Sequence, residues 1–135
     1  MSEDTKIITM KRVLDLMCQI VGEYGVDYVY EKIGLACWNW DAEKQCPSCL
    51  IGHVVSRLGA SDQFLDTYQA VSAAALIGHF ASTYDRTIEE GVKDILGTAQ
   101  LAQDTLKPWG TALMKALTEH ADILRNRVVV EEVPQ

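Results

Sequence analysis

The C-terminal third of the chain carries the pattern that most constrains the fold. Between residues 109 and 124, mostly apolar side chains recur at intervals of three or four positions: Trp109, Ala112, Leu113, Ala116, Leu117, His120 and Leu124. An α-helix has about 3.6 residues per turn, so this spacing places them on one face of a helix. A helix with one apolar face must bury that face, and the segment therefore has to pack against other elements of a core.

Other segments repeat this helical period and have recognisable ends. Gly25 and Gly59 each follow such a segment, in the position where a helix C-cap is typical. We predict helices over about residues 9–24, 47–58, 69–82 and 87–107, together with a short segment over 61–68. The fold class is therefore mainly α, with four to five helices in one compact bundle.

The best-marked helix start is Thr87-Ile88-Glu89-Glu90, which has the sequence of a capping box. In that motif the Thr87 hydroxyl accepts from the amide of Glu90, and the Glu90 carboxylate accepts from the amide of Thr87. We expect the fourth long helix to begin here and to end before Pro108.

Length and composition indicate a single domain. The chain has 135 residues, of which 48% are hydrophobic, enough to form a core without a disulfide or a metal. We predict one helical domain over 1–135, with flexible ends at 1–6 and 131–135. Two segments depart from the helical period: β-prone residues over about 26–40 predict a small β-hairpin, and Val128–Val133 predicts a short C-terminal strand.

The net charge of −7 argues against a generic binder of nucleic acid, whose phosphates repel an acidic surface. Basic residues occur at both ends of the helical run: Lys11 and Arg12 begin the first helix, and Arg125 and Arg127 close the last. These four residues would form one patch if the two ends met. A nucleic-acid-associated regulator therefore stays as an alternative, although we expect no nucleic-acid partner.

Cysteine usage indicates a reducing compartment. The N-terminus has no secretory signal and no segment is long and apolar enough to cross a membrane, so we expect a cytoplasmic protein with reduced thiols. Cys37, Cys46, Cys49 and His53 are the densest group of potential zinc ligands. Only one Cys-x2-Cys pair is present, so we expect buried thiols and no cofactor, with a small zinc-binding domain as an alternative. A thioredoxin-like role for the same pair lacks its βαβ context.

No catalytic motif is recognisable: the sequence has no Gly-x-Ser-x-Gly, no phosphate-binding glycine loop and no His-Glu-x-x-His. We therefore predict that the chain is not an enzyme. Trp38 and Trp40 share one face of the predicted hairpin; they either cover the core or form an exposed aromatic pair for binding. Val128, Val129 and Val130 are further interaction candidates, because a tail strand could pair with the hairpin or with a second chain.

Several short motifs between about residues 10 and 118 occur in a recognisable order: Asp27-Tyr28-Val29-Tyr30, Cys37-Trp38, Pro47-Ser48-Cys49-Leu50-Ile51-Gly52-His53, Leu58-Gly59, Ala99-Gln100-Leu101-Ala102-Gln103-Asp104 and Trp109-Gly110-Thr111-Ala112-Leu113. In these motifs the chain resembles a family of small uncharacterised proteins of actinobacteria and their bacteriophages. That family has no established activity, so the resemblance implies no catalytic or ligand residue. Its members carry Pro-Ser-Cys without a preceding cysteine, and Cys46 is a departure that weakens the zinc and redox hypotheses.

The resemblance implies a small phage accessory or early protein in the bacterial cytoplasm. Together with the missing catalytic motifs, it favours a non-enzymatic protein that acts by binding another protein. The expected partner is a host bacterial protein or a second copy of the chain.

Overall fold

The computed structural model describes residues 6–30, 40–41 and 43–132, with the backbone alone over 128–132. Within these residues the elements are β1 (Ile7–Ile8), α1 (Met10–Tyr24), β2 (Trp40–Asp41), β3 (Cys46–Pro47), α2 (Leu50–Leu58), α3 (Asp62–Thr67), α4 (Ala73–Tyr84), β4 (Thr87–Ile88), α5 (Val92–Asp104) and α6 (Trp109–Glu132). The prediction of a mainly helical, compact fold is confirmed. The described residues hold six helices, one more than the upper expectation.

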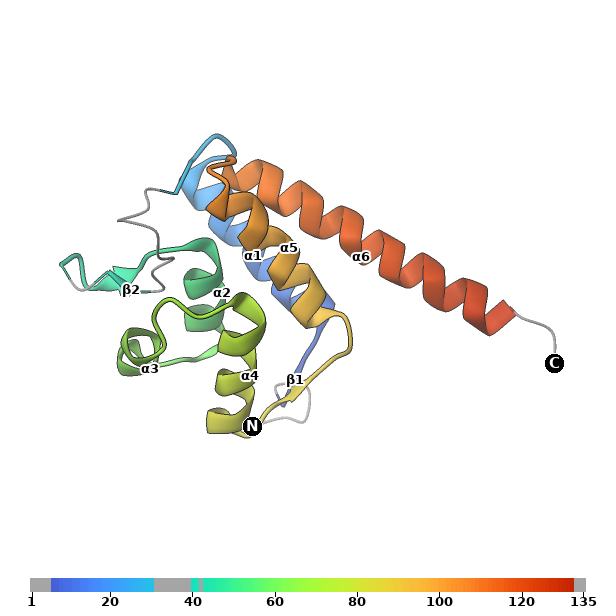
Figure 1. The fold of residues 1–135 in the computed structure, drawn as a ribbon, viewed down its shortest axis with the longest axis horizontal. Coiled ribbons are helices and arrows are strands. Elements are labelled where there is room, and N and C mark those ends of the chain that lie inside the picture. Colours follow the sequence, from blue (N-terminus) through green and yellow to red (C-terminus); the bar gives the residue numbers. More distant parts are fainter. Residues whose placement is uncertain (1–5, 31–39, 42, 133–135) are drawn as a thin grey trace.

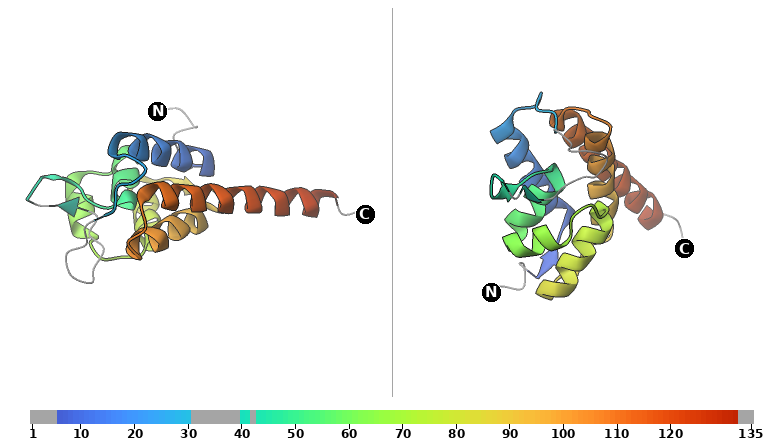
Figure 2. Two further views of the ribbon diagram at one scale, coloured as in Figure 1. Left: turned by 90° about the horizontal axis from the view of Figure 1, so that it is seen from above. Right: turned by 60° about the vertical axis from the view of Figure 1, so that its left-hand side comes forward.

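Helix α6 is the longest element and lies antiparallel to both α1 and α5 (Figure 1). At its beginning, the Trp109 amide donates to the carbonyl of Tyr28, just after α1 (2.7 Å). Near its end, the Arg127 guanidinium donates to the carbonyl of Glu90, just before α5 (3.0 Å). The last turns of α6 extend past the rest of the molecule, as Figures 1 and 2 show.

The core lies between α1, α5 and α6 on one side and α2, α3 and α4 on the other (Figure 1). The predicted apolar stripe of α1 is buried from Met10 to Val21, whereas Tyr24 is 41% exposed. The largest fully buried side chains include Trp109, Phe80, Met17, Ile20, Leu50, Ile51, Leu65, Leu76, Ile77 and Ile95. They come from all six described helices, so one core holds the described chain together.

Side chains from distant parts of the chain accept hydrogen bonds from the N-terminal amides of four helices. The pairs are Glu89 with Met10 of α1 (2.8 Å), Gln103 with Leu50 of α2 (2.6 Å), Tyr84 with Ser61 before α3 (2.9 Å) and Gln100 with Ala73 of α4 (2.7 Å). The first amides of a helix have no acceptor within the helix, and burial without one is costly. These contacts therefore fix how the helices pack. Two of them tie α5 to the first turns of α2 and α4.

We expect Gln103→Leu to lower the free energy of unfolding by about 1–3 kcal/mol, because it leaves the Leu50 amide without its acceptor. Gln103 is fully buried and makes this 2.6 Å contact across the core. Chemical denaturation measures the change. Gln63→Leu, at an exposed position of α3, is the matched control and is expected to change stability by less than about 0.5 kcal/mol. Equal effects of the two variants would contradict the capping role.

The predicted hairpin over 26–40 is located differently where the structure describes it. Residues 26–30 form a turn and irregular chain, and residues 31–39 lie outside the described residues. The antiparallel pair is instead Trp40–Asp41 with Cys46–Pro47. The physical reason is that the carbonyls of Val26 and Tyr28 accept from the first two amides of α6, at Gly110 and Trp109. This stretch caps a helix and does not pair as a strand.

The capping box predicted at Thr87 is wrong. Residues Thr87 and Ile88 form β4, which pairs in parallel with β1, and α5 begins only at Val92. The Glu89 carboxylate reaches Met10 of α1, and Gly91 starts α5 with a φ of 104°. The positive φ favours glycine at this position, and a Cβ there would lie 2.6 Å from Sδ of Met10, so the Met10 side chain would also have to shift.

The predicted strand at the C-terminus is also wrong for the residues described. Helix α6 continues through Glu132, and Val133 lies outside the described residues. Adding residues to a helix that is already docked requires only propagation, whereas a strand needs a neighbour to pair with. The strands that the structure describes pair only with one another, β1 with β4 and β2 with β3. The ends predicted as flexible, 1–6 and 131–135, fall mostly outside the described chain, although residues 131 and 132 are helical.

Candidate protein-binding groove

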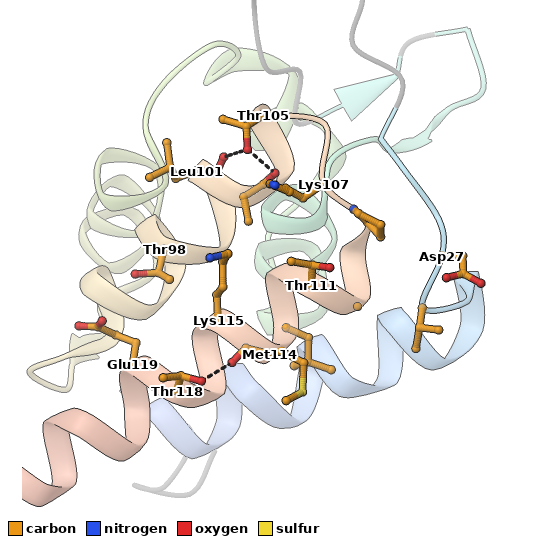
Figure 3. A pocket seen from close by; sticks show the side chains of 15 residues that line it. Asp27, Thr98, Leu101, Thr105, Lys107, Thr111, Met114, Lys115, Thr118 and Glu119 are labelled. Atoms are coloured by element: carbon orange, nitrogen blue, oxygen red, sulfur yellow. Dashed lines mark hydrogen bonds between the residues drawn. The ribbon is translucent and has the colours of Figure 1, made fainter.

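A hollow on the described surface lies along α5 and α6, where these helices meet the turn after α1 (Figure 3). Its volume is about 1040 Å³. We call it the α5–α6 groove, and it is lined by Val26, Asp27, Thr98, Leu101, Ala102, Thr105, Lys107, Pro108, Gly110, Thr111, Leu113, Met114, Lys115, Thr118 and Glu119. It is an open surface feature of a size suited to side chains of a binding partner.

Helix α5 contributes one face to the groove, at the spacing i, i+3, i+4 and i+7: Thr98, Leu101, Ala102 and Thr105. The buried stripe of α5, which includes Ile95 and Ala99, lies beside this face, and Ala102 at the boundary is also buried. Leu101 lies off that stripe and is 68% exposed. The helix therefore presents an apolar side chain to solvent within the groove.

Helix α6 and the turn after α1 supply the other apolar residues. Met114 is 62% exposed and Val26 is 63% exposed. The close approach of this turn to α6 depends on Gly110, because a Cβ there would lie 2.7 Å from the carbonyl oxygen of Val26. The amide of Gly110 donates to the same oxygen at 2.9 Å. A glycine at this position therefore brings Val26 to the edge of the groove.

Two of the four threonines in the groove, Thr105 and Thr118, present little polarity, because their hydroxyls bond to backbone carbonyls of the helix that each one follows or belongs to. The Thr105 hydroxyl contacts the carbonyls of Leu101 (3.1 Å) and Ala102 (3.0 Å), and the Thr118 hydroxyl donates to Met114 (2.9 Å) (Figure 3). These groups have their hydrogen bonds without a ligand. The groove is thus more apolar in effect than its composition suggests.

Charged side chains stand around this apolar surface. Lys107 and Lys115 line the groove from the α5–α6 connection and from α6, and Asp27 and Glu119 supply the opposite charge. Among the side chains that the structure describes, neither lysine takes part in an ion pair. Both ammonium groups are therefore available to a carboxylate on a partner.

An aromatic cluster packs around Trp109, the first residue of α6, on the buried side of that helix. The ring of Trp109 lies 4.5 Å from Tyr28 and 5.8 Å from His53, and Tyr24 lies 5.1 Å from His53. His53 is only 7% exposed. Burial lowers the pKa of its imidazole to about 4, with a smaller contribution from the charge of Arg57. His53 is therefore neutral at pH 7 and serves as a core side chain.

Of the potential zinc ligands predicted from sequence, those that the structure describes have separate roles in packing. Cys49 is buried and caps α2, with its Sγ accepting from the amide of Gly52 at 3.3 Å. Cys46 is half-buried on β3, His53 lies in the aromatic cluster, and Cys37 is outside the described residues. Within the described ranges, no three His, Cys, Asp or Glu side chains gather at a distance suited to a metal ion.

The predicted interaction residues have different locations. Trp40 is 6% exposed, and the Gln69 side chain holds its backbone by accepting from its amide (3.2 Å) and donating to its carbonyl (2.8 Å). Trp40 is thus a core residue, and Trp38 lies outside the described residues. Val128, Val129 and Val130 occupy the last turns of α6.

The basic residues at the ends of the helical run are brought to one end of the molecule, where α1 begins and α6 nears its end. Lys11 pairs with Asp15 (3.2 Å) and Arg125 with Asp122 (3.2 Å), each on its own helix. Arg127 donates to the Glu90 carbonyl, and Arg12 is exposed beside Lys11. Local carboxylates therefore offset much of this charge, which is unfavourable for binding a phosphate backbone.

Sequence reasoning missed the residues that form the groove. Leu101 and Met114 are the informative ones, because both lie off the apolar stripes of their helices and are large. A second apolar position on an otherwise polar face is the signal that could have identified them.

Comparison with protein-family models, with curated proteins and with solved structures gave no match to this chain. Within the part of the chain that the structure describes, none of the helices combines the length and hydropathy needed to cross a bilayer.

Proposed function

We propose that this chain is a non-enzymatic accessory protein that binds another protein through the α5–α6 groove. The observation that supports this most directly is the cluster of three large apolar side chains at its edges. Leu101, Met114 and Val26 are each more than 60% exposed. Covering such side chains is favourable by about 1.5–3 kcal/mol for each one fully buried, which is the usual driving force of protein association.

The polar lining supports binding more than catalysis. The hydroxyls of Thr105 and Thr118 bond to backbone carbonyls of α5 and α6, and the residues that line the groove include no histidine or cysteine. Two lysines and two carboxylates around an apolar centre resemble the polar rim and apolar middle of an interface. The resemblance to small phage proteins supports the context of this proposal, a phage-type accessory protein in a bacterial cytoplasm.

We expect Leu101→Glu and Met114→Glu to abolish capture of the partner, because each places a charge in the apolar part of the groove. Tagged wild type and both variants are incubated with bacterial lysate, and bound proteins are quantified by mass spectrometry. Both sites are exposed, so the variants should keep the wild-type circular dichroism and unfolding midpoint.

The matched control is Ile7→Glu, a large apolar residue that is 47% exposed on β1, at the other end of the molecule. It should capture the same proteins as wild type. If the groove variants and this control bind identical sets of proteins, the proposed function is wrong.

A further inference from the structure

We infer that the partner in the α5–α6 groove is an amphipathic helix that carries two carboxylates two turns apart, with a pair of large apolar side chains between them. This inference rests on the proposed function and names the chemistry of the partner. It follows from the order of the charges in the groove, from the exposed apolar side chains beside them, and from the helical walls.

The charged side chains occur in a definite order along the groove. Figure 3 shows Asp27 at one end and Glu119 at the other, with Lys107 and Lys115 between them. Neither lysine forms an ion pair with a side chain that the structure describes. The middle of the groove is therefore positive although the whole chain has a net charge of −7, and carboxylates on a partner complement it.

The spacing of the two lysines fits the repeat of a helix. Eight positions separate Lys107 from Lys115, which corresponds to about 12 Å along a helix axis. On a partner helix that lies along the groove, residues i and i+7 share one face and are about 10.5 Å apart. Carboxylates at these two positions can each meet one lysine, because the lysine stem is flexible enough to cover the difference.

Large apolar side chains are exposed next to the lysines. Met114 directly precedes Lys115 and is 62% exposed, and Leu101 on the facing helix α5 is 68% exposed. Residues i+3 and i+4 of the partner helix lie between its carboxylates and on the same face. Apolar side chains at these positions would cover Leu101 and Met114, and the flexible methionine can adapt to their shape.

The walls of the groove favour a helix over an extended peptide. An extended peptide needs an open strand edge for its amides and carbonyls, and none of the residues that line the groove belongs to a strand. The walls α5 and α6 use their backbone groups internally, and the hydroxyls of Thr105 and Thr118 bond to the same backbones. A partner helix satisfies its own backbone groups and therefore needs only side-chain contacts.

Binding of designed peptides to the full chain tests this chemistry. The acidic probe is a fluorescein-labelled peptide of about 15 residues, held helical by a lactam bridge on its outer face, with Glu at i and i+7, Leu at i+3 and i+4, and Ala or Gln elsewhere. The basic probe has Lys at i and i+7 and is otherwise identical. Fluorescence anisotropy should give a Kd about tenfold lower for the acidic probe, because it forms two attractive contacts where the basic probe meets two repulsive ones.

Reversing the charge of the two lysines should reverse this preference. Lys107→Glu combined with Lys115→Glu should raise the Kd of the acidic probe by about tenfold and make the basic probe the tighter ligand. The matched control is Lys11→Glu combined with Lys93→Glu, which changes the net charge equally at two exposed lysines outside the groove. The control should keep the wild-type preference. All four sites are exposed, so both proteins should keep the wild-type circular dichroism.

The inference is overturned if neither probe binds wild type, if both probes bind with equal affinity, or if the groove variant and the control change the preference equally. The proposed function is judged separately, by capture from lysate. If Leu101→Glu and Met114→Glu lose the captured protein while the Lys107→Glu and Lys115→Glu variant retains it, the groove binds a protein of different chemistry. Only the paired carboxylates inferred for the partner are then wrong.

Discussion

Lowering the pH from 7 to 4 is expected to cost the folded chain about 3 kcal/mol through His53 alone. Burial lowers the pKa of His53 to about 4 from an ordinary value of 6.5. The unfolded chain therefore takes up a proton below pH 6.5 that the folded chain takes up only near pH 4. The stabilising contribution is complete above pH 6.5 and is lost as the pH falls toward 4, at about 1.4 kcal/mol per pH unit.

Denaturant titrations at pH 7 and pH 4 measure this loss. His53→Gln should reduce the acid-induced change in unfolding free energy by about 3 kcal/mol, because its side chain does not titrate. His79→Gln is the matched control; His79 is exposed and stacks on Tyr68 at 4.4 Å, and its removal should leave the loss in place. The assignment fails if His53→Gln keeps the full acid sensitivity. The lowered pKa of the exposed Glu23, which bonds to Arg57, acts in the same direction but is common to all three proteins.

Trp109→Ala is expected to lower the free energy of unfolding at pH 7 by about 3–5 kcal/mol, the largest effect of any single substitution considered. The Trp109 side chain is fully buried and contacts the rings of Tyr24, Tyr28 and His53. Its removal would leave a large cavity under the first turn of α6, and the helix that carries the groove would lose its main anchor.

Trp109→Phe separates packing from polarity at the same site. The Nε1 of Trp109 is buried and has no hydrogen-bond partner among the described residues. Phenylalanine keeps much of the ring contact and removes this unsatisfied donor, so the two changes partly cancel. We expect a loss of about 1 kcal/mol or less, measured by the same denaturation. A loss equal to that of the alanine variant would show that the indole ring itself is required.

The helices were predictable from sequence because periodicity reports which side of a segment is buried. The stripes of α1 and α6 identified Met17 and Trp109 as core residues, and both are fully buried. The start of α5 was not predictable in the same way. Thr87 and Glu90 satisfy the local rule for a capping box, but Ile8 and Ile88 pair as strands, and this contact spans 80 positions of sequence.

The groove was not predictable, because exposure depends on where neighbouring elements end. Leu124 belongs to the predicted core stripe of α6 and is nevertheless 41% exposed. The zinc hypothesis shows the same limit: spacing placed Cys49 and His53 one turn apart, but spacing does not reveal that one caps a helix and the other joins an aromatic cluster.

The distant caps on the helix N-termini have a consequence for the order of synthesis. In each of the four pairs the acceptor follows its amide in the chain: Glu89 follows Met10, Tyr84 follows Ser61, Gln100 follows Ala73 and Gln103 follows Leu50. A nascent chain that has not yet released α5 from the ribosome lacks the acceptors for α2 and α4. The Leu50 and Ala73 amides can therefore gain these acceptors only after residues 100–103 have emerged, so the packing of α2 and α4 on α5 is completed late in synthesis.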